Sequence, residues 1–488
     1  MRVLYIDIDS QRPDHLGCYG YHRNTSPNID ALAAESVRFE NVYISDAPCL
    51  PSRSALWSGR CGFRNGVVGH GGTASEPFVE GASRGFRNLF GRTGWMWALR
   101  QAGMYTATIS SFGERHSAFH WYAGYNEMHN PGYSGLEVAD DVTPLALDWL
   151  QRNGQRESWF LHVNYWDPHT PYRTPMSFGS PFEHDPLPAW LTEDVWRERW
   201  EGFGPHGAQE PHGYGSETFY TRYPRIPAQL DSMQTVKQWI DGYDTGVCYT
   251  DTHIGRLLNT MADLGILDDT VIIISADHGE NLGELNVWGD HQTADQMTCN
   301  IPLIVRWPGV SPRVDSGLYY HFDWAATLIE LAGGSVPGNW DGRAFTEAFQ
   351  NGREAGREYV VTSQNAWACQ RGVRFDDYLC LRTYHDGYKM LEPVMLFDVA
   401  NDPHEQHDLA AEKPEVVNRA MALLADWQHD MMLRSAHDID PMMTVLREGG
   451  PFHTRGELPA YLKHLRDTGR AHHAQRLAAL HPDEAGEV

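Results

Sequence analysis

The chain has 488 residues, of which 41% are hydrophobic and 21% are charged, and this composition is that of an ordinary globular protein. The length exceeds what one hydrophobic core usually fills, so we expect one large domain and one smaller domain. The 64 acidic residues outnumber the 39 basic residues, and the formal net charge is −25. This balance excludes a basic nucleic-acid-binding surface, so an anionic ligand would have to be held by local cations or a metal ion.

The cysteines and the start of the chain bear on its cellular setting. Seven cysteines, scattered and odd in number, do not form the paired pattern of a disulfide-stabilised secreted domain. Residues 2–8 read as a strand directly after Met1, without the charged and apolar regions of a signal peptide. No segment approaches the roughly 20 apolar residues of a membrane span. We therefore predict a cytoplasmic protein with no membrane-inserted segment.

Strand and helix patterns alternate along the first two thirds of the chain. Short apolar runs predict buried strands at 2–9, 38–43, 105–110, 159–164, 270–275 and 301–306. Helical spacing is found at 28–36, 89–102, 145–152, 246–264 and 324–332. This alternation predicts an α/β fold, with a large, mostly parallel or mixed sheet sandwiched by helices. Chemistry is expected at the carboxyl ends of its strands.

Two regions interrupt or follow this pattern. An aromatic insertion at 177–232 could be a lid or substrate wall, or could simply pack against a neighbouring loop or protomer. We assign residues 1–356, which include it, to a catalytic α/β domain and residues 357–488 to a smaller α+β subdomain. In the latter, runs at 378–383, 388–391 and 394–399 predict a small antiparallel sheet, on which a helix at 414–433 packs. The residues after Leu480 are expected to fray.

Cys49 stands in a segment that reads as a loop entering a helix. Pro51 and Ser52 suit the first helical turn, where proline lacks an amide that would be unpaired and a hydroxyl can cap. Cys49 would then lie at the helix N-terminus, where free amides and the helix dipole favour an anion and lower the pKa of a thiol. Taken alone, a half-buried structural cysteine is the simpler interpretation.

Polar residues also follow three of the predicted strands. Asp7 and Asp9 close the first strand on one face, because strand side chains alternate in direction. Asp277 and His278 come directly after the strand 270–275, where a buried carboxylate is costly unless it is paired or bound to a metal. His169 follows the strand 159–164 in a rigid turn between two prolines.

In this order, the strings resemble the type I sulfatase family of the alkaline phosphatase superfamily. The motifs are Cys49-x-Pro51-Ser52-Arg53, DIDSQRPDHLGCYG at 7–20, Pro168-His169-Thr170-Pro171, ADHGE at 276–280 and LFDVANDPHE at 396–405. The resemblance spans residues 2 to about 433. It implies an alkaline-phosphatase-like fold and a hydrolase of sulfate esters, borne by a small molecule or a saccharide. The aromatic insertion suits sugar rings, which favours a carbohydrate sulfate over a small alkyl sulfate.

The resemblance also implies a modified nucleophile and a metal. A formylglycine-generating maturation enzyme converts Cys49 to formylglycine (3-oxoalanine), whose hydrate attacks sulfur. One divalent ion, expected to be Ca²⁺ with Mn²⁺ as the alternative, is held by Asp9, Asp277, His278 and the modified Cys49.

Three further residues have implied catalytic roles. Arg53 stabilises the attacking hydroxyl, and His169 protonates the departing oxygen. His116 is the base that removes the proton of the second hydroxyl.

The chain departs from the family pattern where lysines are usual. Arg115 and His116 are the candidates to replace a lysine expected after the strand 105–110, and His291 stands where another is expected before Ile301. His70 is a further candidate for the substrate pocket. Histidines in place of lysines should make anion binding more dependent on pH.

One expected metal ligand is also replaced, and other functions stay open. Ser10 stands where the family has a second acid, so whether Ser10 or Asp7 helps to bind the metal is undecided. The alternative function is a phosphonate monoester or phosphodiester hydrolase of the same superfamily. A third possibility is a non-catalytic binding protein with an unmodified Cys49. The oligomeric state is not indicated.

Overall fold

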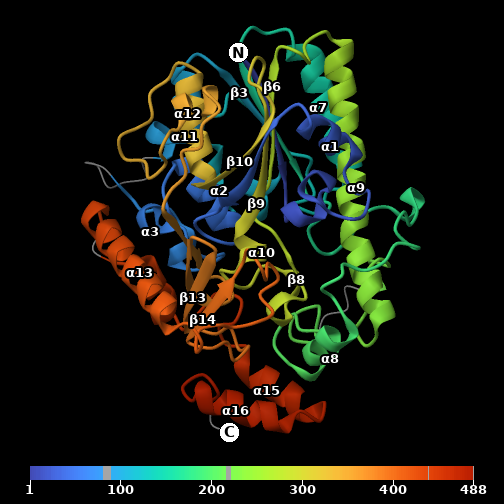
Figure 1. Cartoon of the computed structure of the whole chain (residues 1–488), viewed down its shortest axis with the longest axis vertical. Coiled ribbons are helices and arrows are strands. Elements are labelled where there is room, and N and C mark those ends of the chain that lie inside the picture. The colour runs from blue at the N-terminus through green and yellow to red at the C-terminus, as the bar shows by residue number, and fades with distance from the viewer. Residues whose placement is uncertain (81–89, 216–220, 438, 487–488) are drawn as a thin grey trace.

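The computed structural model describes residues 1–80, 90–215, 221–437 and 439–486. A large sheet runs through the molecule with helices on both faces, and a smaller sheet lies beside its lower end (Figure 1). The expected α/β class, with a mixed main sheet and a smaller antiparallel sheet, is confirmed. Within the described residues, no helix combines the length and the apolarity that crossing a bilayer requires.

The main sheet has eight strands in the order β10-β2-β9-β6-β1-β5-β3-β4. They are β1 (Arg2–Ile8), β2 (Val37–Tyr43), β3 (Tyr105–Ile109), β4 (Glu127–His129), β5 (Trp159–Tyr165), β6 (Thr270–Ser275), β9 (Asn300–Arg306) and β10 (Arg313–Tyr320). β9 is antiparallel to both of its neighbours, and the other neighbouring pairs are parallel. One edge of the sheet therefore gathers the carboxyl ends of the parallel strands and the start of β9.

Alternating side chains of β1 enter two separate hydrophobic cores. Val3 and Tyr5 belong to the core that holds α2 (Cys49–Ser58), α5 (Trp95–Gln101) and α11 (His321–Leu331). Leu4 and Ile6 belong to the core formed with α1 (Pro27–Ala33), α7 (Ala139–Asn153) and α9 (Met233–Asp263). Burial on both faces explains why the parallel strands are continuously apolar, since each buried aliphatic side chain contributes about 1.5–3 kcal/mol.

Helix α9 is much longer than the helix predicted at 246–264. It begins after Ser232, whose Oγ accepts a hydrogen bond from the amide of Thr235 at 3.3 Å. Gly242 and Gly246 weaken the helical pattern, but other chain segments approach the helix closely there. A Cβ at Gly246 would lie 2.6 Å from the carbonyl oxygen of Asp167. The helix predicted at 89–102 forms as α4 (Phe90–Thr93) and α5, and Leu89 lies outside the described residues.

The smaller sheet is antiparallel, in the order β11-β12-β13-β14. Its strands are β11 (Tyr359–Gln364), β12 (Cys369–Phe375), β13 (Tyr378–His385) and β14 (Val394–Asp398), and α13 (Pro414–Arg434) packs on it. The strand predicted at 388–391 is wrong, because Tyr388 and Met390 have φ angles of 65° and 54°, which a strand excludes. β11 and β12 were not predicted, since Gln370, Arg371 and Gly372 conceal the buried character of β12.

A short contact joins the two sheets next to Cys49. Ala47 forms an isolated bridge with Gln364, and its amide donates to the carbonyl oxygen of Ser363 at 2.7 Å. The Gln364 side chain also donates from Nε2 to the carbonyl oxygen of His291 at 2.7 Å. The end of β11 therefore positions both the loop before Cys49 and the segment that carries His291.

The described part of the aromatic insertion includes α8 (Glu193–Glu201), and several of its aromatic side chains pack on other parts of the protein. Trp190 stacks on His404 with ring centroids 4.3 Å apart, and Trp196 donates from Nε1 to the carbonyl oxygen of Leu230. Tyr214, in contrast, lines a cavity. Packing on the fold is thus observed for part of the insertion, and its role as a lid or substrate wall stays a prediction. Residues 216–220 lie outside the described part.

The remaining regular elements are short or C-terminal. They are α3 (Gly62–Asn65), α6 (Phe112–Arg115), β7 (Asn281–Leu282), β8 (Trp288–Asp290), α10 (Gln296–Cys299), α12 (Thr346–Gln350), α14 (Pro441–Arg447), α15 (Leu458–Asp467) and α16 (Ala471–Leu480). The predicted fraying after Leu480 is wrong for the residues described. His481 bonds from Nε2 to Asp386 at 2.8 Å and from Nδ1 to Glu484 at 3.1 Å, and Tyr388 donates to Glu484 at 2.7 Å.

This C-terminal contact predicts a pH-dependent stability. Burial lowers the pKa of His481, but hydrogen bonds to Asp386 and Glu484 outweigh it and raise the pKa to about 9. The resulting stabilisation is complete below the unfolded-state pKa of ~6.5 and is lost as the pH rises through the folded-state pKa. His481→Gln should therefore lower the Tm more at pH ~6 than at pH ~9.5.

Thermal unfolding at the two pH values measures this difference. His407→Gln is the matched control, because that side chain is 82% exposed, and its Tm should follow the wild type at both pH values. An equal loss of Tm for His481→Gln at both pH values would show that the charge of His481 does not fasten this segment.

Candidate active site

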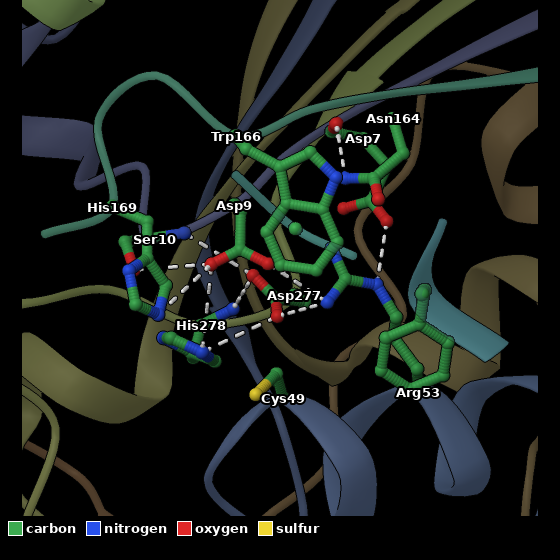
Figure 2. Close-up of polar contacts among 12 residues, drawn as sticks. Asp7, Asp9, Ser10, Cys49, Arg53, Asn164, Trp166, His169, Asp277 and His278 are labelled. Carbon is green, nitrogen blue, oxygen red and sulfur yellow. Dashed lines mark hydrogen bonds and ion pairs between the residues drawn. The ribbon is translucent and has the colours of Figure 1, made fainter. Parts of the chain in front are cut away.

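A cavity of about 740 Å³ opens at the edge of the main sheet where the carboxyl ends meet. The structure brings six sequence-predicted residues to its lining, namely Cys49, His70, Arg115, His116, His169 and His291. The predicted metal ligands Asp9, Asp277 and His278 are buried close to Cys49, as Figure 2 shows. The residues that sequence analysis singled out for chemistry therefore occupy one place in the fold.

Cys49 is the first residue of α2, as predicted, but its thiol does not have a lowered pKa. Burial raises that pKa, and the nearby carboxylates of Asp9 and Asp277 raise it further. These effects outweigh the opposing positive charges of Arg115 and Arg53. The unmodified thiol is therefore a weak nucleophile at neutral pH.

Ser52 does not cap α2, which corrects the sequence expectation. Its hydroxyl donates to the carbonyl oxygen of Asp277 at 2.5 Å. This bond fastens the first turn of α2, which carries Cys49, to the loop after β6. The helix and the carboxylate loop are thus held in a fixed relation.

One buried guanidinium is shared by three buried carboxylates. Arg53 donates from Nε to Asp7 at 2.9 Å. Its Nη1 donates to Asp9 at 2.9 Å and to Asp277 at 2.6 Å, as Figure 2 shows. Burial raises the pKa of Asp277, and the negative charges of Asp9 and Asp7 add to this effect although Arg53 opposes it. Three carboxylates with one guanidinium lack positive charge, and a bound cation would supply it.

The acids and His278 form a donor set that fits a hard divalent ion. His278 Nδ1 lies 2.7 Å from the carbonyl oxygen of Gly279, so this nitrogen carries the proton. Its Nε2 is buried without a hydrogen-bond partner, 3.3 Å from Asp277 Oδ2 and 4.0 Å from Asp9 Oδ1. Two carboxylates and an unprotonated imidazole nitrogen thus converge, and the hydrogen bond to the carbonyl oxygen of Gly279 orients the ring.

Ser10 and Asp7 support this donor set. Ser10 has a φ of 61° and donates from its amide to Asp277 at 3.2 Å and from its hydroxyl to Asp9 at 3.2 Å. Asp7 Oδ2 is occupied by Arg53 and lies 3.3 Å from His162 Nε2. In this structure, Ser10 orients two carboxylates and Asp7 holds the guanidinium.

The histidines around the cavity are neutral at neutral pH. Burial lowers the pKa of His169 to about 3 and that of His291 to about 3. Burial likewise places the pKa values of His70 and His116 well below their usual range. Among the described lining residues, Arg115 carries the only permanent positive charge.

Arg115 lies at the end of α6 and faces the cavity. Its guanidinium carbon lies 5.2 Å from the ring centroid of Trp166, and Nη1 lies 3.4 Å from the carbonyl oxygens of Ser134 and Gly135. Its Nε is buried without a hydrogen-bond partner. Arg115 therefore retains a donor for an anion.

Sequence analysis missed several residues of the cavity wall, among them His206, Trp367 and His453. His453 stacks on Trp367 with centroids 4.7 Å apart, and its Nε2 lies 2.9 Å from His70 Nδ1. His206 Nε2 lies 3.1 Å from Asp290 Oδ2. They come from the C-terminal region, the turn after β11 and the aromatic insertion, and none of them follows a predicted strand.

A second cavity of about 460 Å³ adjoins the first one. The two share Arg115, Thr170, His206, Trp367 and His453 in their linings. Beyond these residues, the second cavity is lined by aromatic and imidazole groups that include Tyr214, Trp239 and His212. A ligand in the first cavity can therefore extend into a mostly apolar space.

Comparisons with known proteins agree with this site. The Sulfatase family model matches residues 2–335, and the model of the C-terminal part of N-sulphoglucosamine sulphohydrolase matches residues 283–429. The chain is 23% identical to N-acetylglucosamine-6-O-sulfatase of Bacteroides thetaiotaomicron over an alignment of 521 residues. That alignment covers 92% of this chain and 89% of the relative.

Two solved structures share the fold. One, a complex with its substrate D-glucosamine-2-N,6-O-disulfate, has a TM-score of 0.69, 21% identity and coverage of 90% of this chain and 99% of the other. The phosphonate monoester hydrolase of Silicibacter pomeroyi has a TM-score of 0.65, 20% identity and coverage of 91% and 97%. His453, which contacts His70, lies beyond the residues that either family model matches.

Proposed function

We propose that this chain, which belongs to the sulfatase family and is a sulfuric ester hydrolase, removes sulfate from carbohydrate sulfate esters. The observation that carries the proposal is the placement of Cys49 between a hard-metal donor set and a cavity lined by neutral histidines. Two of the similar proteins are named for sulfated glucosamines, which supports the choice of substrate class.

Conversion of Cys49 to formylglycine by a maturation enzyme is the second part of the proposal. The hydrate of this aldehyde supplies one hydroxyl to attack sulfur and a second whose deprotonation lets sulfate leave without attack of water on sulfur. The present Sγ lies 3.3 Å from Nε2 of His70 and 3.3 Å from Nε2 of His116. These two imidazoles are the bases nearest to the side chain, and we assign proton removal to His116 with His70 beside it.

The metal-binding residues are Asp9, Asp277, His278 and the modified Cys49, and we expect Ca²⁺, with Mn²⁺ as the alternative. Such an ion supplies positive charge that favours an ionised hydroxyl and polarises the ester. Arg53 keeps the carboxylates aligned, and its Nη2 is buried without a hydrogen-bond partner, so it can assist the nucleophile.

The sulfate group would be held mainly by neutral donors. Arg115 provides the permanent cation, and His291 provides an Nδ1 that is buried without a partner. A sulfate monoester carries one negative charge, which one cation and several neutral donors can match against the acidic protein. The replaced lysines are thus compensated by hydrogen bonding more than by charge.

His169 is the proposed acid for the leaving oxygen. Its Nδ1 is bonded to the carbonyl oxygen of Thr170, which directs Nε2 toward the cavity, 4.0 Å from Asp9. A bound anion raises the pKa of an adjacent imidazole and so favours the protonated form that can donate.

The second cavity supports a saccharide as the leaving group. Its aromatic residues Trp367 and Tyr214 offer flat apolar surfaces, and Arg115 and Glu457 are its charged lining residues among those described. A sugar ring has an apolar face and hydroxyl edges, and it suits this combination. We propose that the sugar unit adjacent to the sulfated one occupies this second cavity.

We also propose the division into a catalytic unit, 1–356, with its insertion at 177–232, and a subdomain, 357–488. The four-stranded sheet supports it, because all of its strands fall within the second unit. The site draws on both units, since Trp367 and His453 line the cavity that contains Cys49.

The main test compares sulfate and phosphonate esters. Chain produced with a formylglycine-generating enzyme should release sulfate from nitrophenyl sulfate and from sulfated saccharides, and mass spectrometry should find formylglycine in the peptide that contains position 49. Cys49→Ala cannot be converted and should lose a factor on the order of 10⁴–10⁶ in kcat.

The phosphonate alternative keeps a specific basis, because the phosphonate monoester hydrolase shares the fold and a phosphonate monoester is also a monoanion. A preference for nitrophenyl phosphonate of about tenfold or more in kcat/KM would replace our assignment with that one. An intact thiol after co-production would instead indicate a binding protein.

His169→Gln should discriminate between leaving groups. Sugar alkoxides need a proton to depart, so kcat on a sulfated saccharide should fall by about 10²–10⁴. Nitrophenolate departs readily without a proton, so kcat on nitrophenyl sulfate should fall far less. Equal losses on both substrates would contradict the acid role, and His120→Gln, outside the cavity lining, is the matched control.

Tyr214→Ala should affect only substrates that reach the second cavity. Loss of one aromatic contact is worth about 0.5–1.5 kcal/mol, so kcat/KM on a sulfated disaccharide should fall about 2- to 12-fold. Nitrophenyl sulfate should be unaffected. Trp190→Ala is the matched control from the same insertion, because Trp190 stacks on His404 and lines neither cavity. Equal effects of the two variants would exclude the saccharide subsite.

A further inference from the structure

We propose that the unconverted chain contains a second metal site, for Zn²⁺ or another thiophilic divalent ion, formed by Cys49 Sγ, His70 Nε2 and His116 Nε2. This site is distinct from the oxygen-rich set of Asp9, Asp277 and His278, although the two adjoin at Cys49. The inference needs no activity of the converted enzyme, so its failure and that of the proposed function can be told apart.

Two of the three ligand-atom separations already suit a zinc ion. Sγ of Cys49 lies 3.3 Å from Nε2 of His70 and 3.3 Å from Nε2 of His116, and all three atoms lie within 4.8 Å of one another. With Zn–S of about 2.3 Å and Zn–N of about 2.0–2.1 Å, tetrahedral ligand atoms stand roughly 3.3–3.6 Å apart. The site therefore needs little rearrangement, and the cavity leaves room for a water molecule as the fourth ligand.

A contact with His453 can fix the tautomer of His70. Its Nδ1 lies 2.9 Å from Nε2 of His453, and His453 in turn stacks on Trp367. If Nδ1 carries the proton and donates it to His453, Nε2 of His70 presents a lone pair to the metal. This is the usual way in which a protein orients a ligating imidazole, and here the orienting residue comes from the C-terminal region.

Binding would proceed with a simple exchange of atoms. The sulfur–hydrogen bond of Cys49 breaks, a sulfur–metal bond forms with the sulfur's electron pair, and the proton passes to solvent. Both imidazoles bind through the lone pair on Nε2, and neither needs to lose a proton. No oxidant or reductant is needed.

The alternative triad that shares the sulfur is Cys49, Asp277 and His278. Asp277 is already bonded to Arg53 at 2.6 Å, and carboxylates favour hard ions, whereas thiolate and imidazole favour Zn²⁺. Conversion of Cys49 to formylglycine replaces the soft sulfur by oxygen and removes the thiophilic site. Maturation would thus decide which class of metal this part of the protein binds.

The test uses full-length chain produced without a maturation enzyme and Co²⁺ as the probe. Wild-type chain should bind Co²⁺ with a thiolate-to-cobalt charge-transfer absorption, which added Zn²⁺ abolishes. Cys49→Ser should lack the absorption, and His70→Gln and His116→Gln should lose it or require far more Co²⁺. His453→Gln, which removes the imidazole that contacts Nδ1 of His70 and leaves the three ligands in place, should weaken binding by about 10–100-fold. Converted chain should not show the absorption.

His278→Gln decides between the two triads. The absorption should persist in this variant if His70 and His116 are the ligands. The proposal is overturned if wild-type chain shows no charge-transfer absorption, or if the absorption is lost in His278→Gln and retained in both His70→Gln and His116→Gln. Circular dichroism confirms that each variant is folded, and two imidazole ligands allow the test to proceed if one variant does not fold.

Discussion

The guanidinium of Arg53 is the interaction on which the rest of the site depends. Without it, the carboxylates of Asp7, Asp9 and Asp277 would face each other in a buried space, where uncompensated charges are strongly unfavourable. Arg53 also lies about one turn after Cys49 on the same helix, α2. A single side chain therefore holds Asp7, Asp9 and Asp277 beside the start of α2, which carries Cys49, where β1, β2 and β6 end.

The site combines a buried cluster of carboxylates with a cavity lining that carries little positive charge. The buried carboxylates of Asp7, Asp9 and Asp277 surround Arg53. The cavity beside them is lined by neutral imidazoles, Arg115, the carboxylate of Asp290 and uncharged residues. Such a lining avoids the cost of burying several cations, and its imidazoles and Arg115 still offer directed hydrogen bonds to sulfate oxygens. The thiophilic metal site proposed for the unconverted chain depends on the same replacement of lysines by histidines, because imidazoles bind metals and lysines at neutral pH do not.

The fold class and most of the site could be predicted because they rest on strand ends. Asp9, Cys49, His169 and Asp277 each follow a predicted strand, and parallel strands bring their carboxyl ends to one edge. His453 could not be predicted in the same way, since only the tertiary packing of the C-terminal region brings it to His70.

The errors of prediction have equally physical causes. The sequence predicts a lowered pKa for Cys49 because the helix N-terminus is visible in it. Burial and the charges of carboxylates that are distant in the sequence raise the pKa instead, and neither is visible in the sequence. Ser52 is a residue type that often caps helices, but its hydroxyl donates to the carbonyl oxygen of Asp277, a partner that is distant in the sequence. The start of α9 was missed because Gly242 and Gly246 serve close approach of neighbouring segments rather than helix termination.

The bridge between Ala47 and Gln364 has a consequence for biosynthesis. Ala47 leaves the ribosome early, but its pairing partner Gln364 emerges only after most of the chain has been made. During that interval the loop before Cys49 lacks its bridge to β11. The segment around Cys49 therefore reaches its final contacts only after β11 has been made.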